Sequence, residues 1–192
     1  MMSKREMRSE ALRRRDEIPR EAVRELSALV RKNVEALPEY AKAETVASYV
    51  SMDNEVQTSD LLRRALQRKK RVIVPRSDMR AGRLTFHDIH SLDELRPGAF
   101  GILEPQGSAS VPLSDAQLIL VPVVAWDYRG GRLGYGKGYF DRELRSKGRG
   151  LAAGLAFESQ RRAALPLTPS DVPLDAVATE ERVIRFGRAN LA

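Results

Sequence analysis

A glycine-rich segment at residues 130–142 constrains the fold of this chain more than any other stretch. Five of its thirteen residues are glycine, and two arginines, one lysine and one aspartate lie among them. The apolar run 118–124 precedes the segment and predicts a strand, while residues 141–145 are expected to form a helix. A strand, a glycine loop and a helix in this order are typical of phosphate sites in α/β proteins, because loop N–H groups and a helix N-terminus both attract anions.

Two standard phosphate-loop fingerprints are not satisfied by this segment. Residues 131–137 fit G-x-x-x-x-G-K, but Gly138 stands where a P-loop carries the serine or threonine that holds magnesium. Residues 134–138 do not fit the dinucleotide pattern G-x-G-x-x-G, and they lie late in the chain. The alternative interpretation is a glycine-rich connecting loop whose charged residues have no binding role. Arg132 and Lys137, placed among glycines at a strand-to-helix junction, favour phosphate binding instead.

The remaining segments alternate between helices and apolar strands. We expect helices at 3–16, 20–36 and 60–67, the second of them ending at Leu37-Pro38. We expect strands, besides 118–124, at 45–50, 71–75, 84–87, 151–156, 176–179 and 182–186. Residues 45–75 have the spacing of a β-α-β unit. The alternation predicts a single domain, residues 1–192, with a three-layer α/β/α fold and a mostly parallel, Rossmann-like central sheet.

Composition excludes several classes of protein. The 192 residues contain no cysteine, which excludes disulfide frameworks and thiolate chemistry, and only two histidines, which disfavours a histidine-rich metal site. No apolar run approaches the roughly 20 residues of a membrane span. The charged N-terminus also lacks the apolar core of a signal peptide. We therefore expect a cytoplasmic protein that binds no membrane.

The net charge of +7 suits an anionic partner, either nucleic acid or a phosphorylated small molecule. An RNA-binding module is one hypothesis, but such modules usually place exposed aromatic side chains among the basic ones. Aromatic residues make up only 6% of this chain, and none lies in the first predicted helix. Most of the basic side chains near the N-terminus are expected to form a solvated helix face: Lys4, Arg5, Arg8, Arg13, Arg14 and Arg15.

Residues 126–142 resemble the signature of the 5-formyltetrahydrofolate cyclo-ligase family, which approximates F-D-x-x-G-x-R-L-G-x-G-K-G-Y-Y-D. The chain departs from it with Trp126 for the first aromatic residue and Phe140 for the second tyrosine. Ser170 replaces the usual histidine of the last resembling segment, so any role of that histidine is absent or met differently. The other segments that resemble the family, in the same order, are 4–8, 49–58, 74–76, 101–105 and 170–175.

The resemblance implies an enzyme that uses ATP and magnesium to convert 5-formyltetrahydrofolate into 5,10-methenyltetrahydrofolate, with release of ADP and phosphate. A formamide carbonyl is a poor electrophile. Transfer of the γ-phosphoryl group to its oxygen gives an imino-phosphate, which the amine at nitrogen 10 attacks to close the ring. We expect a monomer that binds this folate, with or without a polyglutamate tail, and binds no nucleic acid. A further hypothesis is a family member that binds both ligands but has lost or altered activity.

The resemblance also implies roles for individual residues. The expected catalytic groups are Lys137, Arg132 and Tyr139. The expected folate contacts are Val50, Glu55, Tyr135, Gly136, Lys137, Gly138 and Tyr139. The expected ATP contacts are Lys4, Arg5, Glu6, Met7, Arg8, Arg132, Leu133, Gly134, Tyr135, Gly136, Lys137, Gly138, Tyr139 and Phe140. From the residues alone, Glu55 is equally an acid at a helix start, and Tyr139 is equally a core residue.

Asp141 and Asp171 are the expected magnesium ligands by the same resemblance. Magnesium in phosphate sites takes one or two carboxylates and completes its shell with water and phosphate oxygens. Each aspartate also has a purely structural interpretation, because Asp141 suits the first turn of a helix and Asp171 suits a turn before Pro173. Asp175 is a weaker candidate for the same role.

Overall fold

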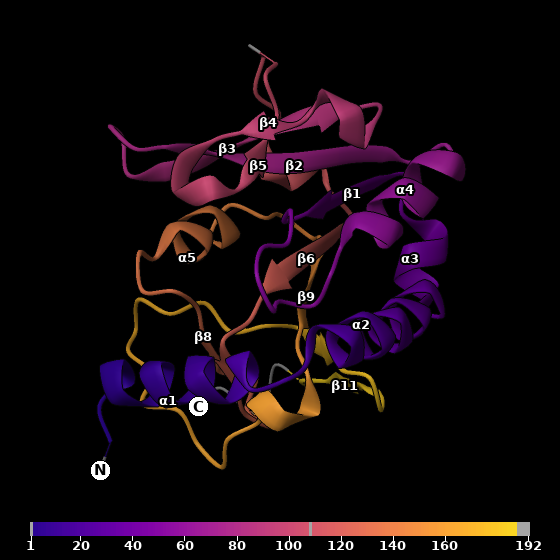
Figure 1. Cartoon of the computed structure of the whole chain (residues 1–192). Helices are drawn as coiled ribbons and strands as arrows, with labels where there is room; N and C mark the ends of the chain where they lie inside the picture. Colours follow the sequence, from indigo (N-terminus) through magenta and orange to yellow (C-terminus); the bar gives the residue numbers. More distant parts are fainter. Residues whose placement is uncertain (1, 108, 188–192) are drawn as a thin grey trace.

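The computed structural model describes residues 2–107 and 109–187 and is built on a seven-stranded sheet in the order β11-β10-β9-β6-β1-β2-β3 (Figure 1). Neighbours from β10 to β2 pair in parallel, and the edge strands β3 and β11 pair antiparallel. The strands are β1 (Thr45–Ser48), β2 (Arg71–Asp78), β3 (Arg83–Ile89), β6 (Leu118–Pro122), β9 (Leu151–Leu155), β10 (Ala176–Ala178) and β11 (Val183–Arg185).

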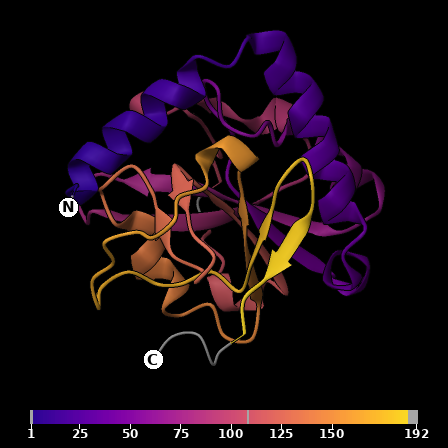
Figure 2. The same ribbon diagram turned by 90° about the horizontal axis from the view of Figure 1, so that it is seen from below.

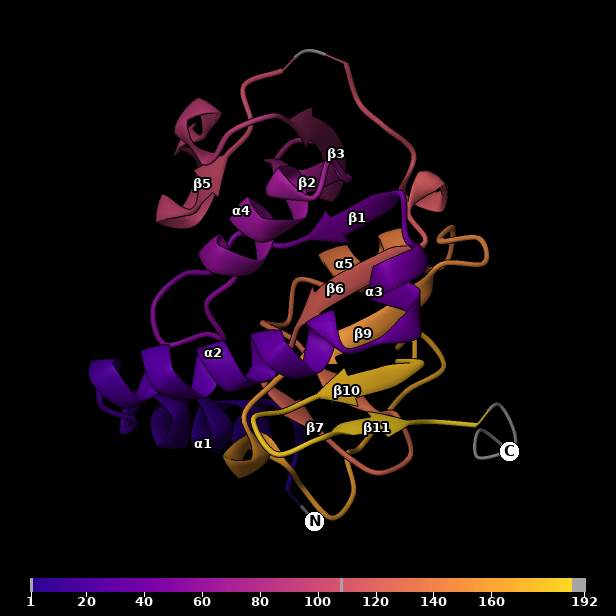
Figure 3. The same cartoon turned by 90° about the vertical axis from the view of Figure 1, so that its right-hand side faces the viewer.

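Helices cover both faces of this sheet. The helices are α1 (Lys4–Asp16), α2 (Arg20–Glu35), α3 (Pro38–Lys42), α4 (Ser59–Gln67) and α5 (Tyr139–Leu144). Figure 3 shows α2 and α3 in front of the sheet and α5 behind it. Figure 2 shows α1 and α2 meeting at an angle along the rim of the molecule, and α1 contacts β7 and η4 there. The short 3₁₀ helices are labelled η1 (Leu92–Glu94), η2 (Ala99–Gly101), η3 (Leu113–Asp115) and η4 (Glu158–Gln160). Short antiparallel ribbons pair β4 (Arg96–Pro97) with β5 (Leu103–Glu104), and β7 (Ala125–Trp126) with β8 (Arg132–Leu133).

The two largest apolar clusters of the core lie on opposite faces of the sheet. Alternate residues of a strand point to opposite faces, so Leu118 and Leu120 pack with α2 and α3, whereas Ile119 and Val121 pack toward α5. All five residues of β6 are buried, as expected for a central parallel strand covered on both sides. The expected three-layer α/β fold with a mostly parallel sheet is therefore confirmed.

The strand order creates a natural binding position between β1 and β6. After β1 the chain crosses through α4 to β2 on one side, whereas after β6 it continues to β9 on the other side. In open α/β sheets, ligands bind at such a switch point, outside the carboxyl ends of the two strands. The segments that follow β1 and β6 begin at Tyr49 and Val123, and both lead into residues expected to bind ligands.

Some details of the predicted elements differ from the structure. Helix α2 ends before Leu37-Pro38 as expected, but Pro38 then begins the short helix α3, which was not predicted, because proline fits the first turn of a helix, where its missing N–H is not needed. The glycine segment does not run directly from strand to loop, since Arg132 and Leu133 pair with Trp126 and Ala125. In addition, β6 ends at Pro122 and α5 begins at Tyr139, two residues earlier than expected in each case. Among residues 2–107 and 109–187, none of the helices is both long and apolar enough to cross a membrane.

Candidate active site

A cavity of about 740 Å³ opens at the carboxyl ends of β1 and β6. Its walls come from the start of α1, the segment after β1, the glycine segment with α5, the η2–β5 segment and the turn at Ser170 and Asp171. The predicted residues that line it are Lys4, Arg8, Val50, Glu55, all of 132–141, and Asp171. Residues separated by more than 160 positions in the sequence thus converge on one cavity.

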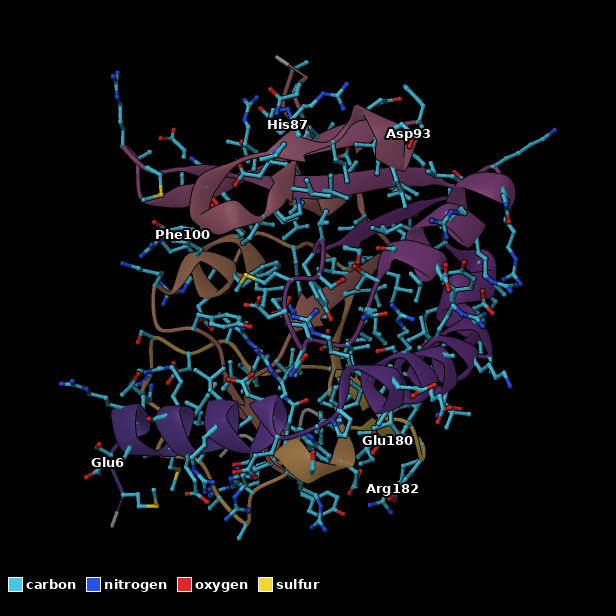
Figure 4. The ribbon with its side chains drawn as sticks, in the orientation of Figure 1. Glu6, His87, Asp93, Phe100, Glu180 and Arg182 are labelled. Carbon is cyan, nitrogen blue, oxygen red and sulfur yellow. The ribbon has the colours of Figure 1, made fainter. Side chains whose placement is uncertain are left out.

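Three of the expected ATP contacts do not line this cavity. Arg5 and Glu6 are exposed, and Glu6 accepts a hydrogen bond from the backbone N–H of Ser3, as part of the capping box of α1. Figure 4 shows Glu6 on the outer side of α1. Met7 packs with Ala11 and Leu133 beneath the glycine segment. The weaker metal candidate Asp175 also lies elsewhere, where its carboxylate accepts from Lys147 and from the Ala152 N–H.

Helix α1 docks on the glycine segment through Arg8. The Arg8 Nε donates to the Gly134 carbonyl at 2.6 Å. A Cβ atom at position 136 would lie 3.2 Å from the guanidinium carbon of Arg8, and the φ of +97° at Gly136 by itself favours glycine. Lys137 is exposed at the edge of the cavity. The close approach of helix and loop brings the cations Lys4, Arg8 and Lys137 to the lining of the same cavity.

A buried ion pair fixes the end of the glycine segment. The Arg132 Nη2 lies 2.9 Å from the Asp141 Oδ1, and the Arg132 side chain is only 3% exposed. The same Asp141 oxygen accepts from the Val172 N–H at 3.1 Å. These bonds join β8, the first turn of α5 and the segment after Asp171, so the two expected metal carboxylates border one cavity from adjoining segments.

Asp171 is held by the N-terminal residue of α1. Its Oδ2 pairs with the Lys4 Nζ and accepts from the N–H and the hydroxyl of Thr168. Burial raises the pKa of Asp171, but the bonds from Lys4 and Thr168 outweigh it and hold the pKa below its usual value. Ser170, where the resembling family has histidine, lines the cavity beside it and bonds the Thr168 hydroxyl at 2.8 Å.

Glu55 is a buried carboxylate that faces the cavity. Its two oxygens accept from the Tyr135 hydroxyl at 2.8 Å and from the Met52 N–H at 3.0 Å. Burial raises the pKa of Glu55, while these two bonds and the charge of Arg15 oppose that rise. Tyr49, Val50, Phe100 and Ile102 supply apolar walls to the same cavity. This part of the cavity suits an aromatic ligand with hydrogen-bond donors at one edge.

The profile of the 5-formyltetrahydrofolate cyclo-ligase family matches residues 1–180. The chain belongs to this family. A 5-formyltetrahydrofolate cyclo-ligase of Escherichia coli K12 is 34% identical over 151 residues, which cover 76% of this chain and 83% of that protein. A probable 5-formyltetrahydrofolate cyclo-ligase of Schizosaccharomyces pombe is 30% identical over 170 residues, covering 80% and 83% of the two chains.

Solved structures agree with this membership in the cyclo-ligase family. The NMR structure of Aquifex aeolicus 5,10-methenyltetrahydrofolate synthetase superposes with a TM-score of 0.86 at 38% identity, covering 97% of this chain and 95% of that one. A 5,10-methenyltetrahydrofolate synthetase from Mycoplasma pneumoniae has the same fold, with a TM-score of 0.76 at 23% identity over 93% and 99% of the chains. The predicted fold, family and enzyme class are thereby confirmed.

The carboxylates of this cyclo-ligase fit a metal that arrives with a nucleotide. Among the described residues, no group of three or more His, Cys, Asp or Glu side chains could hold a metal ion. Asp141 and Asp171 instead border a cavity rich in cations, and each is already paired with one of them. Magnesium in phosphoryl-transfer sites takes only one or two carboxylates and binds substrate phosphates as well. The donor set therefore suits a magnesium–phosphate complex better than a metal enclosed by protein ligands.

Sequence patterns did not reveal the roles of three residues that line the site or lie behind its lining. Asp127 is completely buried and holds the turn between β7 and β8. Arg15 is buried beneath Tyr135, although the neighbouring arginines of α1 are exposed. Phe100, with a φ of +57°, lines the cavity and lies between the β4–β5 ribbon and α5 in Figure 4. Asp127 alone carried a signal, because it is part of the glycine-segment signature.

Proposed function

We propose that this chain converts 5-formyltetrahydrofolate and ATP into 5,10-methenyltetrahydrofolate, ADP and phosphate. The observation that carries the proposal is one cavity that is lined by the cations Lys4, Arg8 and Lys137 and by the buried acceptor Glu55. The cations suit a triphosphate. The carboxylate and the apolar walls suit the donor edge of a pterin ring. Membership in the cyclo-ligase family supports both assignments.

The chemical steps need positioning and charge neutralisation more than covalent help from the protein. The γ-phosphoryl group passes to the formyl oxygen and forms an imino-phosphate, and ADP leaves. The amine at nitrogen 10 then attacks the activated carbon and closes the ring, its proton passes to the departing phosphate, and the C–O bond to phosphate breaks. Lys137, Arg132 and the N–H groups of the glycine segment hold the transferred phosphoryl group, as cations and amides do in other phosphoryl transfers.

The folate is held on the other side of the same segment. Glu55 accepts hydrogen bonds from the amino-pyrimidine edge of the pterin, and Val50 packs against the ring. Tyr135 and Tyr139, which both line the cavity, border the folate as well. Asp141 and Asp171 would hold magnesium, which would supply positive charge to the phosphates of ATP. Lys4 and Arg8 bind the remaining phosphates, and Arg5, Glu6 and Met7 are second-rank candidates because they do not line the cavity.

A direct assay tests the proposed reaction. The protein is mixed with 5-formyltetrahydrofolate, ATP and magnesium, and the absorbance of the methenyl product is followed with time. We expect turnover that needs all three additions. Tight ATP binding without turnover leaves the alternative of a family member with lost or altered activity. A single domain over residues 1–192, a cytoplasmic location and a monomeric state complete the proposal, and light scattering after gel filtration tests the last of these.

Replacement of Asp141 by asparagine is expected to raise the magnesium concentration needed for half-maximal activity by about tenfold. Asparagine keeps the shape but removes a charge that attracts the cation. The measurement is initial rate against magnesium concentration at saturating ATP and folate. Asp60→Asn, a change of an exposed aspartate on α4, is the matched control and should leave the curve unchanged. An Asp141→Asn curve that overlies the wild-type curve contradicts a ligand role.

The KM for the folate is expected to rise as the pH falls through the raised pKa of Glu55. Burial raises this pKa, so the carboxylate loses its charge at a higher pH than an exposed glutamate does. The protonated form keeps less acceptor capacity for the pterin donors. KM for folate and for ATP is measured between about pH 5 and pH 8. Glu55→Gln should have a high KM for folate that does not change with pH. If the KM of this variant still rises at low pH as it does in the wild type, Glu55 is not the group responsible for the rise.

A further inference from the structure

The Arg15 side chain is buried for no evident structural reason. It is 3% exposed, and its Nε and Nη1 have no hydrogen-bond partner. Two nitrogens without a hydrogen-bond partner on a buried cation oppose folding, and an apolar side chain of similar volume is often as stable or more stable at such a position. The adjacent Arg14, by contrast, is half exposed and pairs with Glu10. The position of Arg15 therefore calls for a functional explanation.

Arg15 is the first member of a chain of hydrogen bonds that ends at the cavity. Its Nη2 donates to the Tyr135 hydroxyl oxygen at 2.9 Å, and the guanidinium carbon lies 5.6 Å from the centre of the tyrosine ring. The Tyr135 hydroxyl lies 2.8 Å from the Glu55 Oε1. Tyr135 and Glu55 line the cavity, whereas Arg15 lies behind them. The end of α1 is also tied to the turn before Glu55, because the Asn54 Nδ2 donates to the Asp16 carbonyl at 3.4 Å.

This order determines the direction of the hydrogen bonds. A guanidinium can only donate, so the Tyr135 oxygen must accept from Arg15. The single hydroxyl proton is then directed to Glu55, whose other oxygen already accepts from the Met52 N–H. Both carboxylate oxygens are thus fixed in position before any ligand binds. The positive charge behind Tyr135 also favours the ionised, accepting form of Glu55.

We propose that Arg15 is a positioning residue for the folate site, which acts through Tyr135 to hold Glu55 in the orientation that accepts hydrogen bonds from the pterin. The inference rests on the proposed function, in which Glu55 contacts the folate. It assigns no contact between Arg15 and ATP, although Arg15 belongs to the same helix as Lys4 and Arg8. Loss of Arg15 should therefore affect one substrate and spare the other.

The test compares Arg15→Met with Arg14→Met, which removes the neighbouring exposed arginine. Methionine retains apolar packing but removes the charge and the donors. We expect Arg15→Met to raise KM for 5-formyltetrahydrofolate about tenfold, the size of one charge-assisted hydrogen bond, and to change KM for ATP less than about twofold. Arg14→Met should change neither. Equal increases in both KM values, or no increase, overturn the proposal.

A double-mutant cycle tests whether Arg15 acts through Tyr135. If it does, Arg15→Met combined with Tyr135→Phe raises KM for folate no more than the larger single change does. If the two increases in KM for folate multiply in the double variant, Arg15 does not act through Tyr135. The value of kcat/KM for folate falls at low pH as Glu55 becomes protonated. In Arg15→Met this fall should begin at a higher pH, because a cation that lowers the Glu55 pKa is lost. The other groups that act on Glu55, namely Tyr135, Met52 N–H and the Asp53 charge, are present in both proteins.

Two further experiments apply if the first variant does not fold or the wild-type protein gives no product. If Arg15→Met does not fold, Arg15→Lys replaces it, since lysine retains the charge but lacks the guanidinium fork, and the same split between the two KM values is expected. If the wild-type protein binds 5-formyltetrahydrofolate but gives no product, the proposed reaction fails. Calorimetric affinity for this folate then decides, since weaker binding by Arg15→Met supports the positioning role and equal binding overturns it. A wild-type protein that does not bind this folate overturns both proposals.

Discussion

Replacement of Lys137 by alanine is expected to lower kcat about 100- to 1,000-fold while leaving the fold intact. Removing a single group that stabilises charge in a transition state has this size of effect in other enzymes. Lys137 is exposed at the edge of the cavity and precedes Gly138, whose φ of +67° lies in the left-handed region. Because its side chain supports no packing in the core, the loss should appear in the chemical step rather than in stability.

The measurement is the steady-state rate of methenyl formation, with the thermal midpoint recorded for the same samples. Lys32→Ala, which removes an exposed lysine from α2, is the matched control and should retain wild-type kcat. Lys137→Arg should recover part of the rate, since it restores the charge in a different geometry. A Lys137→Ala protein with near-normal kcat means that the phosphate assignment of this lysine is incorrect.

Replacement of Asp127 by alanine is expected to lower the free energy of unfolding by about 3–5 kcal/mol. The Asp127 carboxylate is completely buried and accepts from the N–H groups of Arg129, Gly131 and Leu165, each at 2.9 Å. Each buried donor left without an acceptor costs about 1–3 kcal/mol. These bonds hold the turn between β7 and β8 and fasten it to the segment at Leu165, so the glycine segment loses its anchor as well.

Urea denaturation at equilibrium gives the change as a shift of the midpoint at constant slope. Asp127→Asn should be intermediate, at about 1–2 kcal/mol, because its amide oxygen still accepts while its NH₂ group faces one of the three donors. Exposed Asp60 again provides the control, as Asp60→Ala should be nearly neutral. A midpoint for Asp127→Ala close to that of the wild type means that water or backbone movement satisfies the three N–H groups.

Most of the sheet could be predicted because its strands are apolar on both sides. A run such as 118–122 can hardly be anything but a buried strand, and the β1-α4-β2 unit has the expected parallel pairing. The β7–β8 hairpin escaped prediction because each of its strands has only two residues, too few for any alternation to be visible. The signature aspartate Asp127 was visible, but its role as an acceptor for three N–H groups depends on the folded turn.

The site could be predicted in part. Glu55 was expected at a strand end, and parallel strands bring their carboxyl ends to one edge of the sheet, so its position by the cavity follows from topology. The pairing of Lys4 with Asp171 depends on how α1 docks, and no local pattern determines that. Arg15 illustrates the limit most clearly. In the sequence it is the third of three consecutive arginines, and only the packing of α1 on the glycine segment distinguishes it from the other two.

The docking of α1 has a consequence for how the protein acquires its activity. Arg8, Arg15 and Lys4 meet partners that follow them by 126, 120 and 167 residues, respectively. Residues as far along the chain as Asp171 must therefore be synthesised before α1 can make all of these contacts. Closing such long loops is entropically unfavourable, so this helix is expected to join late. Its strongly polar composition allows it to remain in water until then, and the nascent chain should complete the lining of the cavity only after Asp171 has been synthesised.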